Sequence, residues 1–277
     1  MTEPDALYAT LMTISQANAV GAESSTTLVG PVAPFAPLQS ITGADDIRAA
    51  FDAEGLTEFV GPDNAAYLMV FPHVPLMRLV NPTTRRGPAR PAFPSGFLRL
   101  GHDIAPVWWL ELTRVPIGAA VWRLDAEATA PRGEAAYRGL ARGWEGARGY
   151  LPPRGLFGPR ARWRGGEFVA AFTDDGVELI SLAEHPGMVP VQAGVWQAVV
   201  PLTEVDAIFE LDLSARWRDE QVRVLDSDGS QVRLLLPDPK PESARAAGAT
   251  EVSPGVWQVI ADRADLTDIS GVERTLR

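Results

Sequence analysis

The segment ARWRGGEFVAAFTDDGVELISL (161–182) is matched later in the chain by ARWRDEQVRVLDSDGSQVRLLL (215–236). The motif GVWQ follows each segment, and after it comes a run of apolar residues that ends in a short acidic stretch. ARWR recurs after 54 residues and GVWQ after 61, so the second copy has about seven extra residues, which we place in PDPKPESARA (237–246). Matching words in the same order at both ends predict a duplicated module.

Each copy is expected to consist of short antiparallel strands. Asp175-Gly176 and Asp228-Gly229 separate β-rich runs, and Asp-Gly favours the type I′ turn of a tight hairpin. The runs that begin with GVWQ supply a further strand in each copy. A small curled sheet of this kind is stable where a single hairpin is not, so we expect an SH3-like barrel in residues 156–212 and another in 213–277.

Tryptophans recur at equivalent places in the two copies, as Trp163 and Trp217 and as Trp196 and Trp257. Equivalent aromatic residues favour packing inside each module, where an indole buries a large apolar area. The alternative is that Trp163 and Trp217 line a groove for a partner, as aromatic residues do in peptide-binding barrels.

The preceding residues, 1–155, are expected to form an α+β domain. Apolar periodicity predicts helices over 5–20 and 43–56, and a glycine-weakened helix over 133–153. The apolar run 65–71 and the run VWWLELTRVPIGAAVWRL (107–124) are expected to be buried strands, the latter paired through a turn at 116–118. The predicted fold class is therefore α+β, with an N-terminal α+β domain followed by two tandem all-β modules.

The net charge of −10 is concentrated in the part of the chain that carries the repeated words. Residues 1–160 contain 14 Arg and 15 acidic residues, whereas 161–277 contain 11 basic and 20 acidic residues. An acidic surface repels nucleic acid and attracts a basic protein. The residues expected to meet such a partner are Asp174, Asp175, Asp206, Asp228, Trp163 and Trp217.

Several classes of function have no support in the sequence. The absence of Cys excludes disulfides and thiolate metal sites and fits a reducing cytoplasm. No signal peptide is apparent, and the most apolar stretch is too interrupted to span a bilayer, so we expect a cytoplasmic protein without a membrane partner. The three His, at 73, 102 and 185, lack metal-ligand spacing, and no phosphate-binding or nucleophile motif is present. We therefore predict no catalytic, cofactor or metal residue.

An alternative interpretation places an anion site in the N-terminal domain. Arg85 and Arg86 lie in a Pro/Gly loop, and Arg138, Arg142 and Trp144 lie together in YRGLARGWEGARGY (137–150). Guanidinium groups beside aromatic rings suit a phosphate or nucleotide-like ligand. An enzyme or a phosphate-binding protein with its site here is thus the alternative to a non-enzymatic interaction protein. The competing interpretation of these arginines is a solvated loop with surface ion pairs.

The repeated units resemble the β-rich modules of uncharacterised actinobacterial proteins, whose pattern is W-R-G-x-x-[FV], then D-G, then P-G-V-W and an acidic close. The matching words are RWRGGEF, DDG, AGVWQ and PLTEVDAI in the first copy, and RWRDEQV, SDG, PGVWQ and DLTDI in the second. The resemblance covers about 161–269 and carries over no functional residue. Some proteins of this kind look like immunity proteins, inhibitors kept beside a toxin, so the resemblance implies inhibition of a protein partner.

Overall fold

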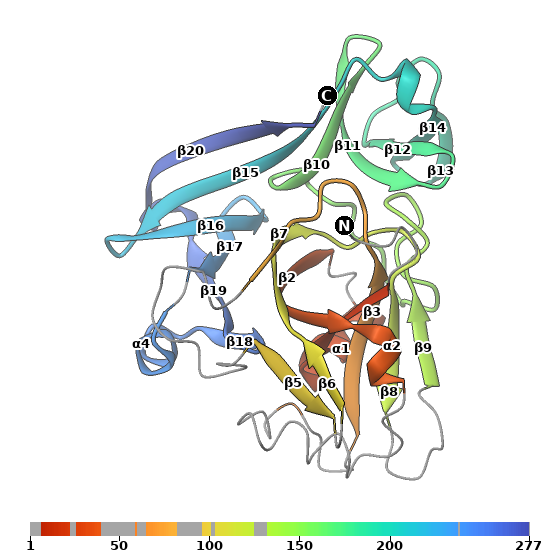
Figure 1. Ribbon diagram of the computed structural model, residues 1–277. Helices are drawn as coiled ribbons and strands as arrows, with labels where there is room; N and C mark the ends of the chain where they lie inside the picture. The colour runs from red at the N-terminus through yellow and green to blue at the C-terminus, as the bar shows by residue number, and fades with distance from the viewer. Residues whose placement is uncertain are drawn as a thin grey trace.

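The computed structural model describes residues 7–22, 26–39, 59, 65–81, 96–100, 103–124, 132–237 and 239–276. These residues form twenty strands and only three short helices. Figure 1 shows an N-terminal sheet in red to green and a second, larger sheet in green to blue above and beside it. Both sheets are antiparallel throughout.

The N-terminal sheet has seven strands in the order β4-β7-β2-β1-β3-β8-β9. In chain order these are β1 (Leu7–Met12), β2 (Thr27–Pro34), β3 (Ala66–Pro72), β4 (Leu79–Val80), β7 (Trp108–Arg114), β8 (Ala120–Leu124) and β9 (Arg132–Ala136). The same part of the chain contains α1 (Ile14–Ala22), α2 (Phe35–Leu38) and a separate hairpin of β5 (Phe97–Leu100) and β6 (Asp103–Pro106).

The predicted α+β class of the N-terminal domain is wrong, because this part is mostly strand. The helix expected over 5–20 is the strand β1 followed by α1, and the helix expected over 133–153 is β9 followed by turns. Successive residues of β1 enter two different cores: Ala9 and Leu11 pack in one, and Tyr8 and Met12 in the other. A strand buried on both faces has no polar alternation, so its apolar residues imitate a helical period. The helix expected over 43–56 lies outside the described residues.

The strand pair expected around the turn at 116–118 is also not formed. Both strands exist, but β7 pairs with β2 and β4, whereas β8 pairs with β3 and β9. The strands β2, β1 and β3 lie between them in the sheet. Turn chemistry therefore indicated where the chain bends, but not which strands become neighbours.

The second sheet has eleven strands and two 3₁₀ turns. Its strands are β10 (Gly158–Trp163), β11 (Gly166–Thr173), β12 (Gly176–Ser181), β13 (Val189–Gln192), β14 (Val195–Val200), β15 (Ala207–Trp217), β16 (Glu220–Ser227), β17 (Gln231–Leu236), β18 (Thr250–Ser253), β19 (Val256–Asp262) and β20 (Leu266–Thr275). The 3₁₀ turns are η3 (Leu202–Glu204) and η4 (Arg263–Asp265), and the helix α4 (Pro241–Ala246) precedes β18.

The second sheet contains one strand order twice. The first unit runs β13-β14-β12-β11-β10-β15 and the second runs β18-β19-β17-β16-β15-β20. In both units the pairing of the last hairpin shifts at the same place, between Pro190 and Gln192 and between Glu251 and Ser253. We call these arrangements the first unit and the second unit.

The prediction of two SH3-like barrels is wrong. Among the described strands, the first and last strands of each unit do not pair with each other, so neither unit closes into a barrel. The strand β15 passes through the expected boundary at 212/213 and belongs to both units. The first half of β15 pairs with β10 and the second half pairs with β16. The strand β20 pairs with β15 along most of the length of β15. Sharing one long strand joins the units into a single open sheet. The hairpin turns lie where expected, but Asp175 and Asp228 do not have the positive φ that a type I′ turn requires.

The extra residues of the second unit have two locations. One is Leu225, a bulge in β16 between the pairs Val224–Leu234 and Asp226–Arg233. The others lengthen the connection that follows β17: it spans 237–249, whereas the equivalent connection after β12 spans only 182–188. The longer connection contains α4.

Both units place equivalent faces against the N-terminal part. Ile180 and Val195 of the first unit pack on Leu140 and Ala141. In the second unit Leu225, Leu235 and Val256 pack on three side chains from outside the unit, namely Trp109, Leu112 and Phe157. Gly30 in β2 lies close to the second unit, since an added Cβ atom there would lie 2.7 Å from Cγ2 of Val256.

Candidate functional site

The two units differ at one equivalent tryptophan. Trp196 pairs with Pro190 and Ser181 in the first unit, and Trp257 pairs with Glu251 and Leu236 in the second. Trp257 is only 3% exposed, whereas Trp196 is partly open to solvent.

The helix α4 covers Trp257. Its residue Ala244 is buried in the same apolar cluster as Trp257, and Cζ of Arg245 lies 5.1 Å from the centre of the indole ring. Such a cation–π contact adds electrostatic attraction to the apolar packing. The sequence P-E-S-A-R-A explains the helix locally, because proline is well accommodated in the first turn and alanine is the best helix former.

The first unit has no equivalent of α4. Its short connection bends over Trp163 instead, where the His185 ring lies 5.9 Å from the indole and 4.8 Å from Phe168. The indole of Trp196 makes no hydrogen bond, ring contact or cation–π contact within the described part of the chain. The exposed, apolar Pro190 is a cross-strand neighbour of Trp196, and the exposed Leu182 follows Ser181, its other cross-strand neighbour. We call the surface formed by Pro190 and Trp196 the open end.

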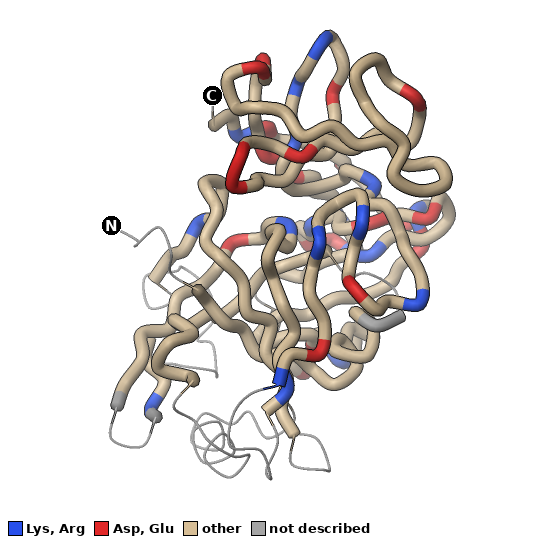
Figure 2. Tube along the Cα trace, turned by 90° about the vertical axis from the view of Figure 1, so that its right-hand side faces the viewer, with Lys and Arg blue, Asp and Glu red and all other residues tan. Residues whose placement is uncertain are grey.

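The four acidic residues expected to meet a partner are all exposed. Asp174 and Asp175 form the turn between β11 and β12, and Asp206 follows η3. Asp228 lies in the second unit, between β16 and β17, where its carboxylate accepts backbone hydrogen bonds from Ser230 and Gln231 that hold its pKa below the usual value. Figure 2 shows acidic residues on several turns in the upper part of the molecule. The structure therefore spreads these residues over separate turns of both units.

Trp163 and Trp217 lie in the cores of their units. They are 2% and 4% exposed, and the guanidinium groups of Arg164 and Arg218 lie over their rings, with Cζ 4.5 and 4.4 Å from the ring centres. This agrees with the packing interpretation and leaves little indole surface for a partner. Of the four repeated tryptophans, Trp196 is the one that is partly accessible, although the repeat predicts a core position for it as well. The signal that could have identified it is the length difference between the two connections.

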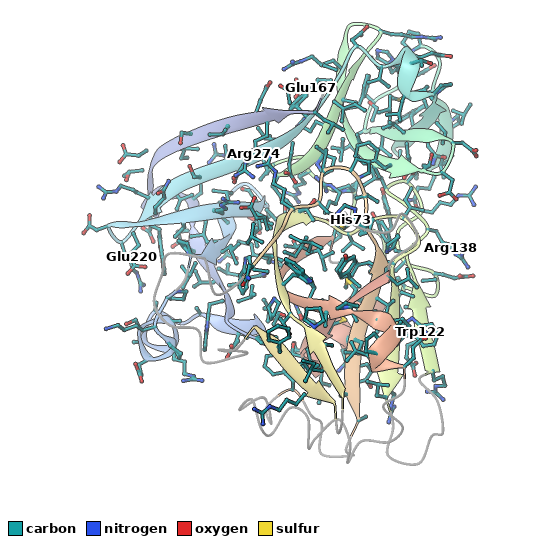
Figure 3. The ribbon with its side chains drawn as sticks, in the orientation of Figure 1. His73, Trp122, Arg138, Glu167, Glu220 and Arg274 are labelled. Atoms are coloured by element: carbon teal, nitrogen blue, oxygen red, sulfur yellow. The ribbon has the colours of Figure 1, made fainter. Side chains whose placement is uncertain are left out.

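The residues of the alternative anion site are not brought together around a cavity. Arg138 forms an exposed ion pair with Glu145 and lies at the edge of the molecule in Figure 3. Arg142 is exposed, and Trp144 is buried against Tyr137, with 5.2 Å between ring centres. Arg85 and Arg86 lie outside the described residues.

A buried carboxylate fixes the segment 137–150 to the first unit. Oε2 of Glu178 accepts a hydrogen bond from the backbone N–H of Leu140 at 2.7 Å, and Oε1 accepts bonds from Ala141 N–H and the Gln197 amide at 3.0 and 2.7 Å. Burial raises the pKa of Glu178 above its usual value, while these hydrogen bonds oppose the shift. Since the carboxylate is buried and accepts hydrogen bonds from both the segment and the first unit, it holds the two together.

The described residues contain no group of three His, Asp or Glu side chains that could hold a metal ion, and no helix among them is long and apolar enough to cross a membrane. Comparison with protein-family models, curated proteins and solved structures finds no match.

Proposed function

We propose that the protein is a non-enzymatic interaction protein that binds a basic protein partner through the open end of the first unit. The observation that carries this proposal is the difference between Trp196 and Trp257. The second unit covers its tryptophan with a helical turn that bears Ala244 and Arg245. The open end presents the same strand position with no helix of the described residues over it and with the indole partly exposed, so it suits a similar helical turn with an arginine from another protein.

Charge supports a basic occupant. Glu184 is exposed and lies three residues beyond Ser181, the cross-strand neighbour of Trp196. The exposed Asp174, Asp175 and Asp206 belong to the same unit. Glu184 follows the end of β12 that carries Ser181, whereas Asp174 and Asp175 lie at the opposite end of that strand. The excess of acidic residues in the unit would raise the encounter rate with a basic partner and disfavour acidic competitors.

The proposal extends to the biological setting. The absence of cysteine favours action in a reducing cytoplasm. The resemblance of the repeated words to immunity-like proteins favours a partner that is inhibited when it is bound. A tandem duplication is the simplest origin of the two units with one strand order.

The experiment is affinity capture with three forms of the tagged full-length protein: wild type, Trp196→Ala and Ile260→Ala. Ile260 is the control because it is an apolar strand residue of the second unit that is 60% exposed. We expect wild type and Ile260→Ala to retain one stoichiometric basic protein that dissociates as salt rises, and Trp196→Ala to lose it. Equal retention by all three forms would refute the open end as the binding surface.

A further inference from the structure

A cavity of about 70 Å³ lies between the second unit and the N-terminal sheet. Its polar lining comes from four segments far apart in sequence: Thr26 and Thr27 at the start of β2, Arg114 at the end of β7, Arg154 in the connection to β10, and Asp226 and Arg233 on β16 and β17. The two sheets together therefore build a site that neither contains alone.

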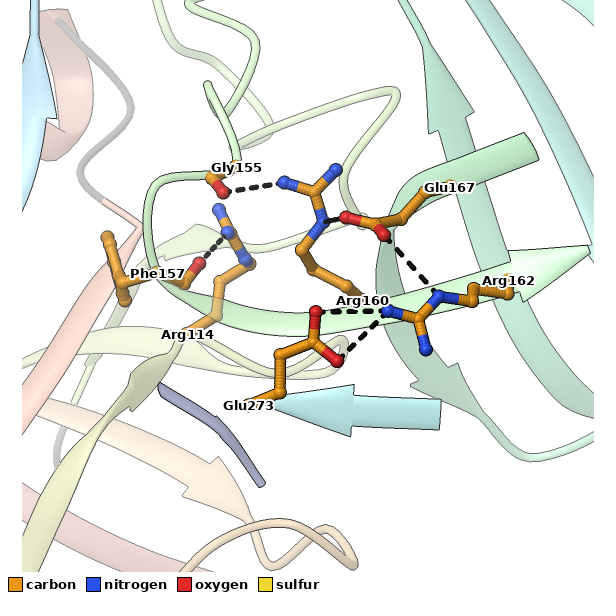
Figure 4. A network of polar contacts seen from close by, with 7 residues as sticks. All are labelled: Arg114, Gly155, Phe157, Arg160, Arg162, Glu167 and Glu273. Atoms are coloured by element: carbon orange, nitrogen blue, oxygen red, sulfur yellow. Dashed lines mark hydrogen bonds and ion pairs between the residues drawn. The ribbon is translucent and has the colours of Figure 1, made fainter. Parts of the chain in front are cut away.

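Arg114 is the central group of this cavity. It is 3% exposed, and its guanidinium donates a hydrogen bond to the carbonyl of Phe157 while Cζ lies 5.0 Å from the Phe157 ring centre (Figure 4). Its Nε–H has no hydrogen-bond partner, and no carboxylate of the described residues forms an ion pair with it. Burial lowers the pKa of Arg114 to about 10, which leaves the group charged at neutral pH.

Two further arginines line the cavity and add positive charge to that of Arg114. Arg233 is exposed and makes no hydrogen bond or ion pair within the described part of the chain. Arg154 donates a hydrogen bond to the Ser227 carbonyl and lies 3.8 Å from the Asp226 carboxylate. The carboxylate of Asp226 thus opposes three guanidinium groups.

The neighbouring Arg160 is another cation, and its own ion pair is formed elsewhere. Its guanidinium donates to the Gly155 carbonyl at 2.8 Å and is paired with Glu167 at 2.9 Å, as Figure 4 shows. Its positive charge acts against that of Arg114. A buried cation without an ion-pair partner is costly, and an anion in the cavity would lower that cost.

We propose that this cavity binds a phosphate group, either as inorganic phosphate or as the end of a small phosphomonoester. The cavity lining holds three guanidinium groups and one carboxylate, which leaves two positive charges and matches a phosphate dianion better than a carboxylate ligand; the Glu210 carboxylate, which also acts on Arg114, lies outside this lining. Guanidinium forks and the hydroxyls of Thr26 and Thr27 are donors that phosphate oxygens accept. The inference is independent of the open end, since the cavity lies on the second unit.

The test is calorimetric titration with inorganic phosphate at constant ionic strength, together with the melting temperature in the presence and absence of phosphate. Wild type should bind phosphate and melt at a higher temperature with it, because a ligand that binds only the folded state stabilises that state. Arg233→Ala and Arg154→Ala should each bind roughly tenfold more weakly, because each loses a charge-assisted contact. Both positions are exposed, so these variants are expected to fold.

Arg99→Ala is the matched control, because Arg99 is an exposed arginine on the separate β5–β6 hairpin. It should bind phosphate as wild type does. Absence of binding to wild type, or equal weakening by Arg99→Ala and Arg233→Ala, would overturn the proposal. A parallel titration with glycerol 3-phosphate distinguishes the sources: tighter binding than phosphate assigns the cavity to a phosphomonoester, and weaker binding assigns it to the free ion.

Discussion

Arg245 lies over the indole of Trp257, while the equivalent Trp196 of the first unit is left partly exposed. The two tryptophans occupy the same position in the same strand order, so the difference comes from the connection that precedes them. In one unit the chain itself covers the ring. In the other the ring is available to another molecule, which is the basis of the proposed function.

Removing each of these tryptophans should have opposite consequences for stability and binding. Trp257→Ala should lower the free energy of unfolding by about 3–5 kcal/mol, because it leaves a cavity in a packed cluster. Trp196→Ala should cost only about 1 kcal/mol and should abolish partner binding. Urea denaturation measures the first effect, and capture of the partner measures the second. A larger loss of stability at Trp196 than at Trp257 would contradict the assignment of covered and open ends.

The packing of the second unit on the N-terminal sheet can be tested at one glycine. Gly30→Ala should lower the free energy of unfolding because the new methyl group meets Val256 and because φ at this position is +119°. Gly229→Ala is the control, with φ of +104° and no neighbour within 4 Å. The backbone conformation should cost about 1–2 kcal/mol at either position, and the clash about 1–3 kcal/mol more at Gly30. Equal losses at the two positions would show that the sheets do not meet here.

Glu178 predicts a pH dependence of stability. Since its folded-state pKa is raised above the usual 4.5, the folded state holds its proton to higher pH than the unfolded state does. Its contribution therefore makes the free energy of unfolding fall as pH rises from about 4.5 through the raised pKa. Glu178→Gln should remove this contribution and should lower stability by about 1–3 kcal/mol, because an amide nitrogen cannot accept one of the three hydrogen bonds.

Denaturation at several pH values measures this effect. The exposed Glu204→Gln is the control and should follow the wild-type curve. The burial of Glu210 raises its pKa as well, so part of the slope should persist in Glu178→Gln. A Glu178→Gln curve that keeps the full wild-type slope would assign the pH dependence to other groups.

Charge reversal separates the interaction proposal from the alternative anion site at Arg138. Asp174→Lys, Asp175→Lys and Asp206→Lys combined should slow the association of a basic partner and weaken its binding, whereas Arg138→Ala should leave both unchanged. Asp228 is kept in this variant because it caps a turn. The affinity of each variant for the partner is measured at low and moderate salt. Loss of partner binding in Arg138→Ala, together with full binding in the Lys variant, would reverse the conclusion.

Local features of the fold could be predicted from the sequence, but their assembly could not. The Asp-Gly sites at 175–176 and 228–229 indicated hairpins that are present. The strand β1 has apolar residues at helical spacing because both of its faces are buried. The pairing of β15 with three strands depends on contacts across the whole second sheet, which no local pattern encodes.

The candidate site was predictable only in part. The acidity of the second half and the burial of Trp163 and Trp217 follow from composition and from the repeated words. The exposure of Trp196 depends on where the extra residues of the second unit fold, and Arg114 appeared as an unremarkable residue inside an apolar run. Its buried position results from the contact between the two sheets.

The most direct measurement is ¹⁹F NMR of the protein labelled with fluorotryptophan, recorded with and without the purified partner. The chain has eight tryptophans, and the Trp196 resonance is assigned by Trp196→Phe. The account predicts that saturating partner shifts the Trp196 resonance and leaves those of the buried Trp163, Trp217 and Trp257 in place. A complex that forms with no change at Trp196 would contradict the assignment of the open end as the binding surface.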